Sequence, residues 1–217
     1  MAVQYMLQIK RRGLMLILSS PSGAGKTTLA QLLLKSDQHI RPSVSFTTRK
    51  KRANEIEGIH YYFTDHETFK RMIEQNAFLE YAEVFGEMYG TPKKFVNQHL
   101  ENGEDVLFDI DWQGNRSLTQ IAREDTVSVF IFPPSKKELL DRLKSRDQDS
   151  ADIVKARMDK ANEELSHWHE YDYSIINRDI DESLRKLLSI LRAERLKKAR
   201  RLGVTDFVNN LINEELE

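Results

Sequence analysis

The sequence contains no cysteine, and only five of its 217 residues are proline. Disulfides and thiolate metal sites are therefore excluded. No apolar run approaches the roughly 20 residues that a membrane-spanning helix needs. Lys10, Arg11 and Arg12 follow the first apolar residues instead of preceding them, which argues against a secretory signal. We expect a soluble, cytoplasmic protein.

Neither sign of charge dominates, since 33 basic residues balance 34 acidic ones. A chain of this kind has no global attraction to nucleic acid or to an acidic membrane, so we expect neither as a partner. Any basic site has to be local. Basic residues do crowd residues 192–201, but acidic residues surround them, which favours a solvated helix face over a nucleic-acid patch.

Short apolar runs alternate with helical patterns along most of the chain. Residues 14–19, 105–110, 127–132 and 173–176 lack strict alternation, as is typical of strands buried on both faces. Helical spacing follows at 27–35, at 136–145 with Ser135 as N-cap, along a stripe from Val154 to Trp168, and at 184–191. This order predicts an α/β fold with a parallel sheet flanked by helices.

Two segments interrupt that order. Residues 41–90 carry short strand patterns and one amphipathic helix at 66–75, which predicts a small mixed α+β insert. The polar break at 147–152 predicts a second insert at about 142–157. Residues 1–40 and 91–217 would form the core. Apolar residues at helical spacing between 204 and 212 leave open whether this end packs on the body or on another subunit, as in a homo-oligomer.

Residues 20–27 read Ser-Pro-Ser-Gly-Ala-Gly-Lys-Thr, directly after a predicted strand and before a helical pattern. Strand, glycine-rich turn and helix form the context of a phosphate-binding loop, or P-loop. Gly23 and Gly25 would turn backbone N–H groups toward phosphate oxygens, Lys26 would reach the β- and γ-phosphates, and Thr27 would bind Mg²⁺. Ser20 replaces the first glycine of the strict pattern. The alternative is a strand-to-helix turn that binds no ligand.

A basic cluster supplies groups for a second anion. Arg49 and Arg52 are spaced to converge on one phosphate, with the phenols of Tyr61 and Tyr89 nearby in the sequence. A solvated basic loop or a nucleic-acid patch is the alternative. The P-loop favours the phosphate interpretation, because a donor nucleotide requires an acceptor.

Several polar residues are candidates for reading a base. A buried carboxylate at Glu80 would need donors, which the N1–H and N2–H₂ edge of guanine supplies, while Ser45 and Thr91 could donate to O6. Asp109 and Asp111 follow a buried strand, would share one face of it, and would point into the usual ligand crevice. The alternatives are an exposed charge at Glu80, a helix N-cap at Thr91 and a strand-end cap at Asp109 and Asp111.

Three arginines flank the polar break: Arg142, Arg146 and Arg157. Mobile arginines that close over a site stabilise the charge that phosphoryl transfer spreads over oxygens. Surface pairing between residues four apart, such as Glu138 with Arg142, is the alternative.

Taken together, these stretches resemble the guanylate kinase family over about residues 14–195. Four carry the resemblance: the P-loop, residues 45–49 with Arg52, residues 83–91 reading Glu-Val-Phe-Gly-Glu-Met-Tyr-Gly-Thr, and residues 109–114 reading Asp-Ile-Asp-Trp-Gln-Gly. The resemblance implies a core, a nucleotide-monophosphate-binding insert and a lid. It implies transfer of the γ-phosphate of MgATP to GMP or dGMP, giving ADP and GDP, in purine nucleotide metabolism.

The resemblance also implies roles for individual residues. ATP would be bound by Ser20, Pro21, Ser22, Gly23, Ala24, Gly25, Lys26, Thr27, Thr28 and, near adenine, Asn177. The GMP phosphate would be held by Arg49, Arg52, Tyr61 and Tyr89, and guanine would be read by Ser45, Glu80, Thr91 and Asp111. Asp109 would also belong to the GMP-binding site. Catalysis would depend on Lys26, Arg49, Arg142, Arg146 and Arg157, with Mg²⁺ at Thr27.

The chain departs from the family pattern at four positions. Lys51 and Asn54 stand where proline and glycine are frequent, Asp147 follows Arg146 where glycine is frequent, and Ser20 is an uncommon occupant of its position. We expect these changes to affect rate more than the activity itself. Two other functions stay open: a non-catalytic, protein-binding module of the same fold, which intact Lys26 and Thr27 disfavour, and a P-loop kinase of another small phosphorylated metabolite.

Overall fold

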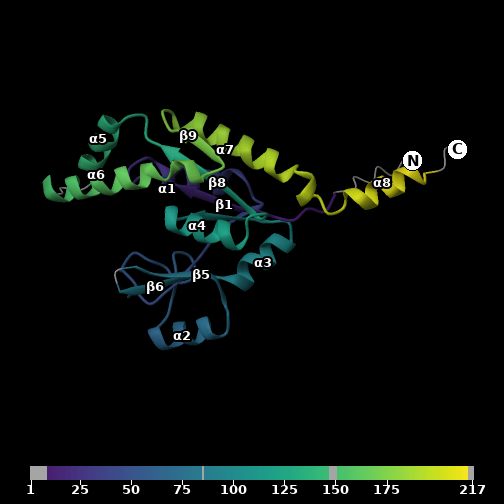
Figure 1. Ribbon diagram of the computed structural model, residues 1–217, viewed down its shortest axis with the longest axis horizontal. Helices are drawn as coiled ribbons and strands as arrows, with labels where there is room; N and C mark the ends of the chain where they lie inside the picture. The colour runs from purple at the N-terminus through teal and green to yellow at the C-terminus, as the bar shows by residue number, and fades with distance from the viewer. Residues whose placement is uncertain (1–8, 85, 147–150, 215–217) are drawn as a thin grey trace.

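A computed structural model describes residues 9–84, 86–146 and 151–214 (Figure 1). Its main sheet has five parallel strands in the order β2-β7-β1-β8-β9. The strands are β1 (Met15–Ser19), β2 (Ile40–Pro42), β7 (Asp105–Asp109), β8 (Thr126–Phe132) and β9 (Tyr173–Ile176). The predicted parallel sheet is thus confirmed, with β2 as an edge strand that the sequence did not indicate.

Alternate residues of β1 explain how helices cover both faces of this sheet, because successive strand side chains point to opposite faces. Leu16 and Leu18 pack with Leu33 of α1 (Lys26–Ser36) and Leu187 of α7 (Ile180–Arg195). Met15 and Ile17 face the other way, toward α3 (Lys93–Glu101) and α4 (Trp112–Ile121). The central strand is therefore apolar throughout, which is why its sequence shows no alternation.

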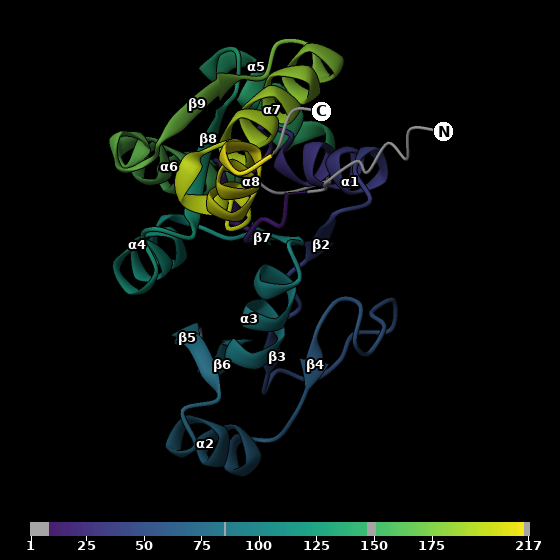
Figure 2. The ribbon, with the colours of Figure 1, turned by 90° about the vertical axis from the view of Figure 1, so that its right-hand side faces the viewer.

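Residues 43–92 mostly form the insert, which Figure 2 shows as a lobe beneath the main sheet with α3 near the junction. Its sheet has the order β4-β3-β6-β5. The elements are β3 (Phe46–Thr47), β4 (Tyr62–Phe63), α2 (His66–Glu74), β5 (Phe78–Val84) and β6 (Glu87–Pro92). Strand β2 crosses the boundary expected at residue 41, since Pro42 still pairs with Leu107 of the main sheet.

Two helices lie at the predicted lid, α5 (Lys136–Arg146) and α6 (Ala151–Ser166). The Ser135 hydroxyl caps α5 by accepting the Glu138 N–H at 3.1 Å, as predicted. Leu139 and Leu143 pack against Ala161 of α6. Trp168 does not continue the inward stripe: the helix ends at Ser166, a 3₁₀ turn (Trp168–Glu170) follows, and 51% of Trp168 is exposed.

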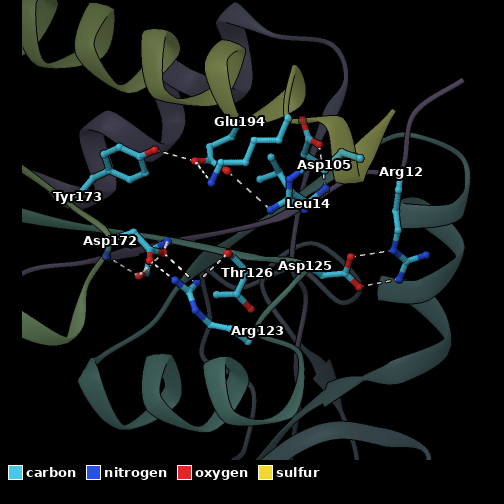
Figure 3. A network of polar contacts seen from close by, with 12 residues as sticks. Arg12, Leu14, Asp105, Arg123, Asp125, Thr126, Asp172, Tyr173 and Glu194 are labelled. Atoms are coloured by element: carbon cyan, nitrogen blue, oxygen red, sulfur yellow. Dashed lines mark hydrogen bonds and ion pairs between the residues drawn. The ribbon is translucent and has the colours of Figure 1, made fainter. Parts of the chain in front are cut away.

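An ion-pair network fixes the amino-terminal edge of the main sheet (Figure 3). Asp105, fully buried at the start of β7, accepts the Leu14 N–H at 3.0 Å and pairs with Arg11 at 2.6 Å and Arg195 at 2.7 Å. Arg12 donates two hydrogen bonds to the Asp125 carboxylate, of 2.7 and 2.6 Å. This network lies at the end of the strands opposite to the P-loop and serves the stability of the core.

The last described helix is α8 (Val204–Ile212), which extends away from the body in Figure 1 and confirms the helix predicted there. Within the described parts of the chain, no helix is long and apolar enough to cross a membrane.

Candidate active site

The P-loop connects β1 to α1 at the carboxyl edge of the main sheet. Gly23 and Gly25 have φ values of 93° and 98°, which side chains rarely tolerate. Gly25 is the N-cap of α1, and no side chain caps that helix. The first N–H groups of α1 consequently have no capping acceptor, so the helix presents its partial positive charge and its donors to the adjoining space.

A cavity of about 250 Å³, here termed the P-loop cavity, adjoins these groups. Its lining combines the loop with polar side chains from three other elements: Ser20, Pro21, Ser22, Gly23, Gly25, Lys26, Thr27, Asp109 and Glu164. Lys26 Nζ lies 2.5 Å from Asp109 Oδ1 and donates to the Ile110 carbonyl at 3.3 Å. The lining thus includes the Lys26 ammonium, the Thr27 hydroxyl and the N–H groups at the start of α1. These are the groups that a bound phosphate chain requires.

A second cavity of about 450 Å³ lies on the other side of the loop and is termed the Asn177 cavity. Its lining residues are Gly23, Gly25, Thr28, Arg142, Asn177, Arg178, Asp179 and Ile180. Asn177, predicted near adenine, is only 4% exposed and donates from Nδ2 to the Ala24 carbonyl at 2.8 Å. Its side chain therefore contacts the P-loop directly.

A third cavity of about 390 Å³, the insert cavity, lies between the insert and the core. Ser45, Glu55 and Tyr61 line it from the insert, and Thr27 and Asp109 line it from the core. Thr27 and Asp109 also line the P-loop cavity. The two cavities therefore meet at these residues, at the carboxyl end of β7 and the start of α1.

Arg49 is oriented by a carboxylate that the sequence did not single out. Its guanidinium donates to both oxygens of Glu55, at 2.6 and 3.1 Å, and lies 5.4 Å from the ring centre of Tyr61. The bond to Glu55 raises the pKa of Arg49, against the opposing effect of burial. Arg49 and the Arg52 backbone N–H together lower the pKa of Glu55 to about 2, so this pair stays charged at any neutral pH.

The remaining phosphate candidates gather beside this pair. The rings of Tyr61 and Tyr89 lie 5.9 Å apart, and burial raises the pKa of Tyr61. Arg52 contacts the Arg49–Glu55 pair through its backbone, because its N–H donates to Glu55 at 2.8 Å. The side chain of Arg52 is exposed. Lys51 and Asn54 are exposed in the same loop, where neither proline nor glycine is required for the observed path.

Glu80 and Thr91 form a direct pair across β5 and β6. Thr91 Oγ1 donates to Glu80 Oε1 at 2.6 Å, and Thr91 is buried in β6, so it is not a helix N-cap; Pro92 caps α3. Burial raises the pKa of Glu80, and the Thr91 hydroxyl partly offsets this effect. Glu80 is therefore a partly buried carboxylate, in contrast to the exposed charge that was the alternative.

Asp111 differs from the expected strand geometry. Strand β7 ends at Asp109, and Asp111 is the N-cap of α4, accepting the N–H groups of Gln113 and Gly114 at 3.1 Å. The two aspartates therefore do not share a strand face. Asp109 pairs with Lys26 at the cavities, whereas part of the acceptor capacity of Asp111 is used by its own helix.

The lid arginines are only partly brought to the site. Arg142 lines the Asn177 cavity and pairs with Glu138 one turn earlier, as the surface alternative proposed. Arg157 is half-buried on α6. The side chain of Arg146 and all of Asp147 lie outside the described residues.

Sequence reasoning missed Glu164 and Tyr171. Glu164 lines the P-loop cavity, and its Oε2 is buried without a hydrogen-bond partner among the described residues. Burial raises its pKa, with Lys160 and Lys26 opposing. Burial also raises the pKa of Tyr171. Helical spacing held a signal for Glu164, which lies three residues after the buried Ala161 and so on the inward side of α6.

Oxygen donors at the P-loop cavity suit a hard cation. The Thr27 hydroxyl and the Asp109 carboxylate face the space where phosphates would lie, and Mg²⁺ is commonly held by one or two such ligands together with phosphates and water. Among the residues with described side chains, no cluster of three or more histidine or acidic residues could hold a metal ion without phosphate.

Comparison with known proteins gives concordant results. The family model for guanylate kinase matches residues 12–194. The guanylate kinase of Nitrobacter winogradskyi is 55% identical over 94% of this chain and 93% of its own length, and that of Paramagnetospirillum magneticum is 53% identical over 94% and 95%. A crystal structure of guanylate kinase from Anaplasma phagocytophilum superposes with a TM-score of 0.75 at 39% identity, covering 95% of this chain and 99% of that one.

Proposed function

This chain belongs to the guanylate kinase family of nucleoside-monophosphate kinases, which phosphorylate GMP using ATP, and we propose that it performs this transfer at the P-loop and insert cavities. One observation carries the assignment of the site: the two cavities meet at Thr27 and Asp109. A donor phosphate chain in one cavity and an acceptor phosphate in the other would thus approach each other without a covalent intermediate.

On the donor side, residues 20–28 would surround the phosphates of ATP. The uncapped N-terminus of α1 supplies backbone donors, and Lys26 supplies a positive charge. Lys26 would exchange its contact with Asp109 for phosphate oxygens. Thr27 would bind Mg²⁺, with Asp109 close by; when bound, the cation neutralises charge on the β- and γ-phosphates. The adenosine would lie toward the Asn177 cavity.

On the acceptor side, Arg49, Arg52, Tyr61 and Tyr89 would hold the phosphate of GMP. The guanidinium of Arg49 is ordered before any ligand arrives, because Glu55 fixes its fork. A planar fork can give two parallel hydrogen bonds to a phosphate, which a lysine cannot.

Guanine would be read by the pair of Glu80 and Thr91, together with Ser45 and Asp111. No ion pair of Glu80 is found among the described residues, and its burial disfavours the charged form. The guanine N1–H and N2–H₂ groups would supply the missing donors. Adenine presents an acceptor at N1, so AMP would leave Glu80 unsatisfied. Sites built on such bonds reject analogues by roughly 10⁴-fold or more.

Transfer itself would need no general base, because the acceptor oxygen is already anionic. Positioning and charge stabilisation would carry the catalysis, with Lys26, Arg49, Arg142, Arg146 and Arg157 around the moving phosphoryl group. Helices α5 and α6 lie together at one end of the molecule (Figure 1), where they would act as a lid that brings Arg142 and Arg157 inward on closure.

The same proposal includes dGMP as an acceptor, since every residue assigned to the acceptor would bind its phosphate or its guanine and none is assigned to the 2′-hydroxyl that dGMP lacks. It places the enzyme in the cytoplasm, where its nucleotide substrates are. The exposed Leu211 and Ile212 of α8 support a homo-oligomer as an alternative to a free helix.

A coupled assay of ADP release tests the proposal. MgATP is offered with GMP, dGMP, AMP, CMP, UMP and IMP in parallel, and Lys26→Ala serves as the control. We expect strong turnover only with GMP and dGMP, and its loss in the variant. Folded protein without turnover on any acceptor would contradict the proposal and would favour a non-catalytic module or another phosphorylated acceptor.

A further inference from the structure

Asn177, directly after β9, contacts the P-loop through a hydrogen bond to the backbone carbonyl of Ala24. We propose that Asn177 is a positioning residue that fixes the Ala24–Gly25 peptide, so that the Gly25 N–H is held facing the donor phosphates before ATP arrives. This inference rests on the proposed function of the P-loop, but it concerns how the loop keeps its shape and not which nucleotide it binds.

Asn177 is itself held rigidly. It directly follows β9, its backbone N–H donates to the Phe132 carbonyl at 2.9 Å, and its side chain is almost completely buried. Nδ2 donates to the Ala24 carbonyl at 2.8 Å. The facing atom has to be the nitrogen, because a carbonyl oxygen only accepts hydrogen bonds. Hence the contact fixes the orientation of both groups.

Fixing that carbonyl also fixes the next amide. The described peptides are all trans, and in a trans peptide the C=O and N–H point in opposite directions. With the Ala24 carbonyl directed at Asn177, the Gly25 N–H points away from Asn177. The peptides on either side are also held, since the Ala24 N–H donates to Pro21 at 3.1 Å and the Gly25 carbonyl accepts from Leu29 at 3.1 Å.

Gly25 and Asn177 are matched in size. A Cβ at position 25 would lie 2.4 Å from Asn177 Nδ2, and the φ of 98° is strained for any side chain. The glycine therefore permits the approach that the hydrogen bond needs. Gly25 is also one of the residues that line the P-loop cavity, so an amide fixed here takes part in ligand contact without any rearrangement on binding.

Two other roles for Asn177 make different predictions. If the side chain only fills space, Asn177→Asp should resemble the wild type, because aspartate has the same shape, while Asn177→Ala should be worse. If it only contacts adenine, both variants should bind a phosphate chain without adenine normally. A positioning donor requires that aspartate be at least as harmful as alanine, because its carboxylate repels the Ala24 carbonyl.

The test measures binding of ADP and of inorganic tripolyphosphate, with Mg²⁺, to the full-length wild type, Asn177→Asp, Asn177→Ala and Asn115→Ala. Asn115 is an equally buried asparagine on α4 and controls for loss of a buried amide. Thermal melting of each variant reports on folding. We expect both Asn177 variants to bind both probes about tenfold more weakly, since a lost hydrogen bond of this kind typically changes an equilibrium by that order, with KM for GMP unchanged.

A direct readout is the Gly25 amide signal in ¹⁵N–¹H spectra of the nucleotide-free protein. It should shift in both Asn177 variants and stay unchanged in Asn115→Ala. Wild-type binding of tripolyphosphate by Asn177→Ala and Asn177→Asp, or an unshifted Gly25 amide, would overturn the inference. These outcomes are separate from the enzyme assay, because a wild type that binds the probes but does not phosphorylate GMP would contradict the proposed function alone.

Discussion

Replacing Glu80 by glutamine should weaken recognition of guanine without weakening the fold. Glutamine keeps the shape and an oxygen for the 2.6 Å bond from Thr91, but it removes the charge and turns one acceptor into a donor. One guanine N–H would then face an NH₂ group. Loss of a hydrogen bond to a charged group is worth about 1.5–3 kcal/mol, which corresponds to a fall of about 10- to 150-fold in kcat/KM for GMP.

Stability should respond in the opposite direction. Burial raises the pKa of Glu80, so the folded protein disfavours its charged form. A neutral glutamine avoids this cost, and the melting temperature at pH 8 should stay equal or rise. Glu83→Gln, an exposed change on the same strand, is the matched control and should alter neither quantity.

The assay is steady-state kinetics with GMP and with IMP, which lacks the 2-amino group, alongside thermal melting. The variant should lose activity on GMP and discriminate less between GMP and IMP. A kcat/KM for GMP equal to that of the wild type would refute the assignment of Glu80 to the base. A large fall in melting temperature would refute the interpretation of its burial.

Three further predictions concern separate parts of the molecule. Arg49→Lys should raise KM for GMP by about tenfold or more, because a point charge cannot give the two parallel hydrogen bonds that a planar guanidinium can give to a phosphate; KM for ATP in the same assay should not change. Asp105→Ala should lower the free energy of unfolding by about 3–5 kcal/mol, because it removes the buried carboxylate that pairs with both Arg11 and Arg195 and leaves Arg195 with Asp37 alone; urea denaturation measures this, and KM values should not change. KM for GMP should fall as pH rises through the raised pKa of Glu80, because guanine binds the ionised form. The stability linked to this group behaves in the opposite way: it is present at low pH and is lost over the same rise in pH. The pH profile of KM for GMP in Glu80→Gln should lack this component.

The features that the sequence predicted well are local ones. The P-loop needs only a strand, two glycines and a helix in the right order, so residues 14–36 could be assigned from spacing alone. The four apolar runs were correctly predicted as the strands β1, β7, β8 and β9, because a strand buried on both faces is apolar at nearly every position. The Ser135 N-cap likewise depends on four consecutive residues, from Ser135 to Glu138.

What the sequence could not show depends on contacts between distant segments. Strand β2 is only three residues long, and it is a strand because β7 pairs with it. Glu164 lines the P-loop cavity only because α6 packs there. It lies 138 positions after Lys26, and this separation in the sequence does not indicate that the two residues share a cavity. Asp111 was expected on a strand, but the strand stops at Asp109 and the residue caps the next helix instead.

The cations of the site share one property that bears on phosphate recognition. Lys26 holds Asp109, and Arg49 holds Glu55, so each is already paired with a carboxylate in the nucleotide-free protein. Binding a phosphate therefore exchanges one anion for another, and the gain is the difference between two pairings, not the full strength of either. The exchange favours a ligand with more charge and more acceptor oxygens than a carboxylate, as phosphate has.

This exchange also links the two halves of the reaction. If Lys26 turns to donor phosphates as proposed, Asp109 would lose its partner beside Thr27, at the residues that line both the P-loop and the insert cavities. A carboxylate without a partner there disfavours further negative charge, unless a hard cation accompanies the phosphates. Under the proposed function, the release of Lys26 would therefore favour a donor that arrives as its magnesium complex, at the residues shared by the two cavities.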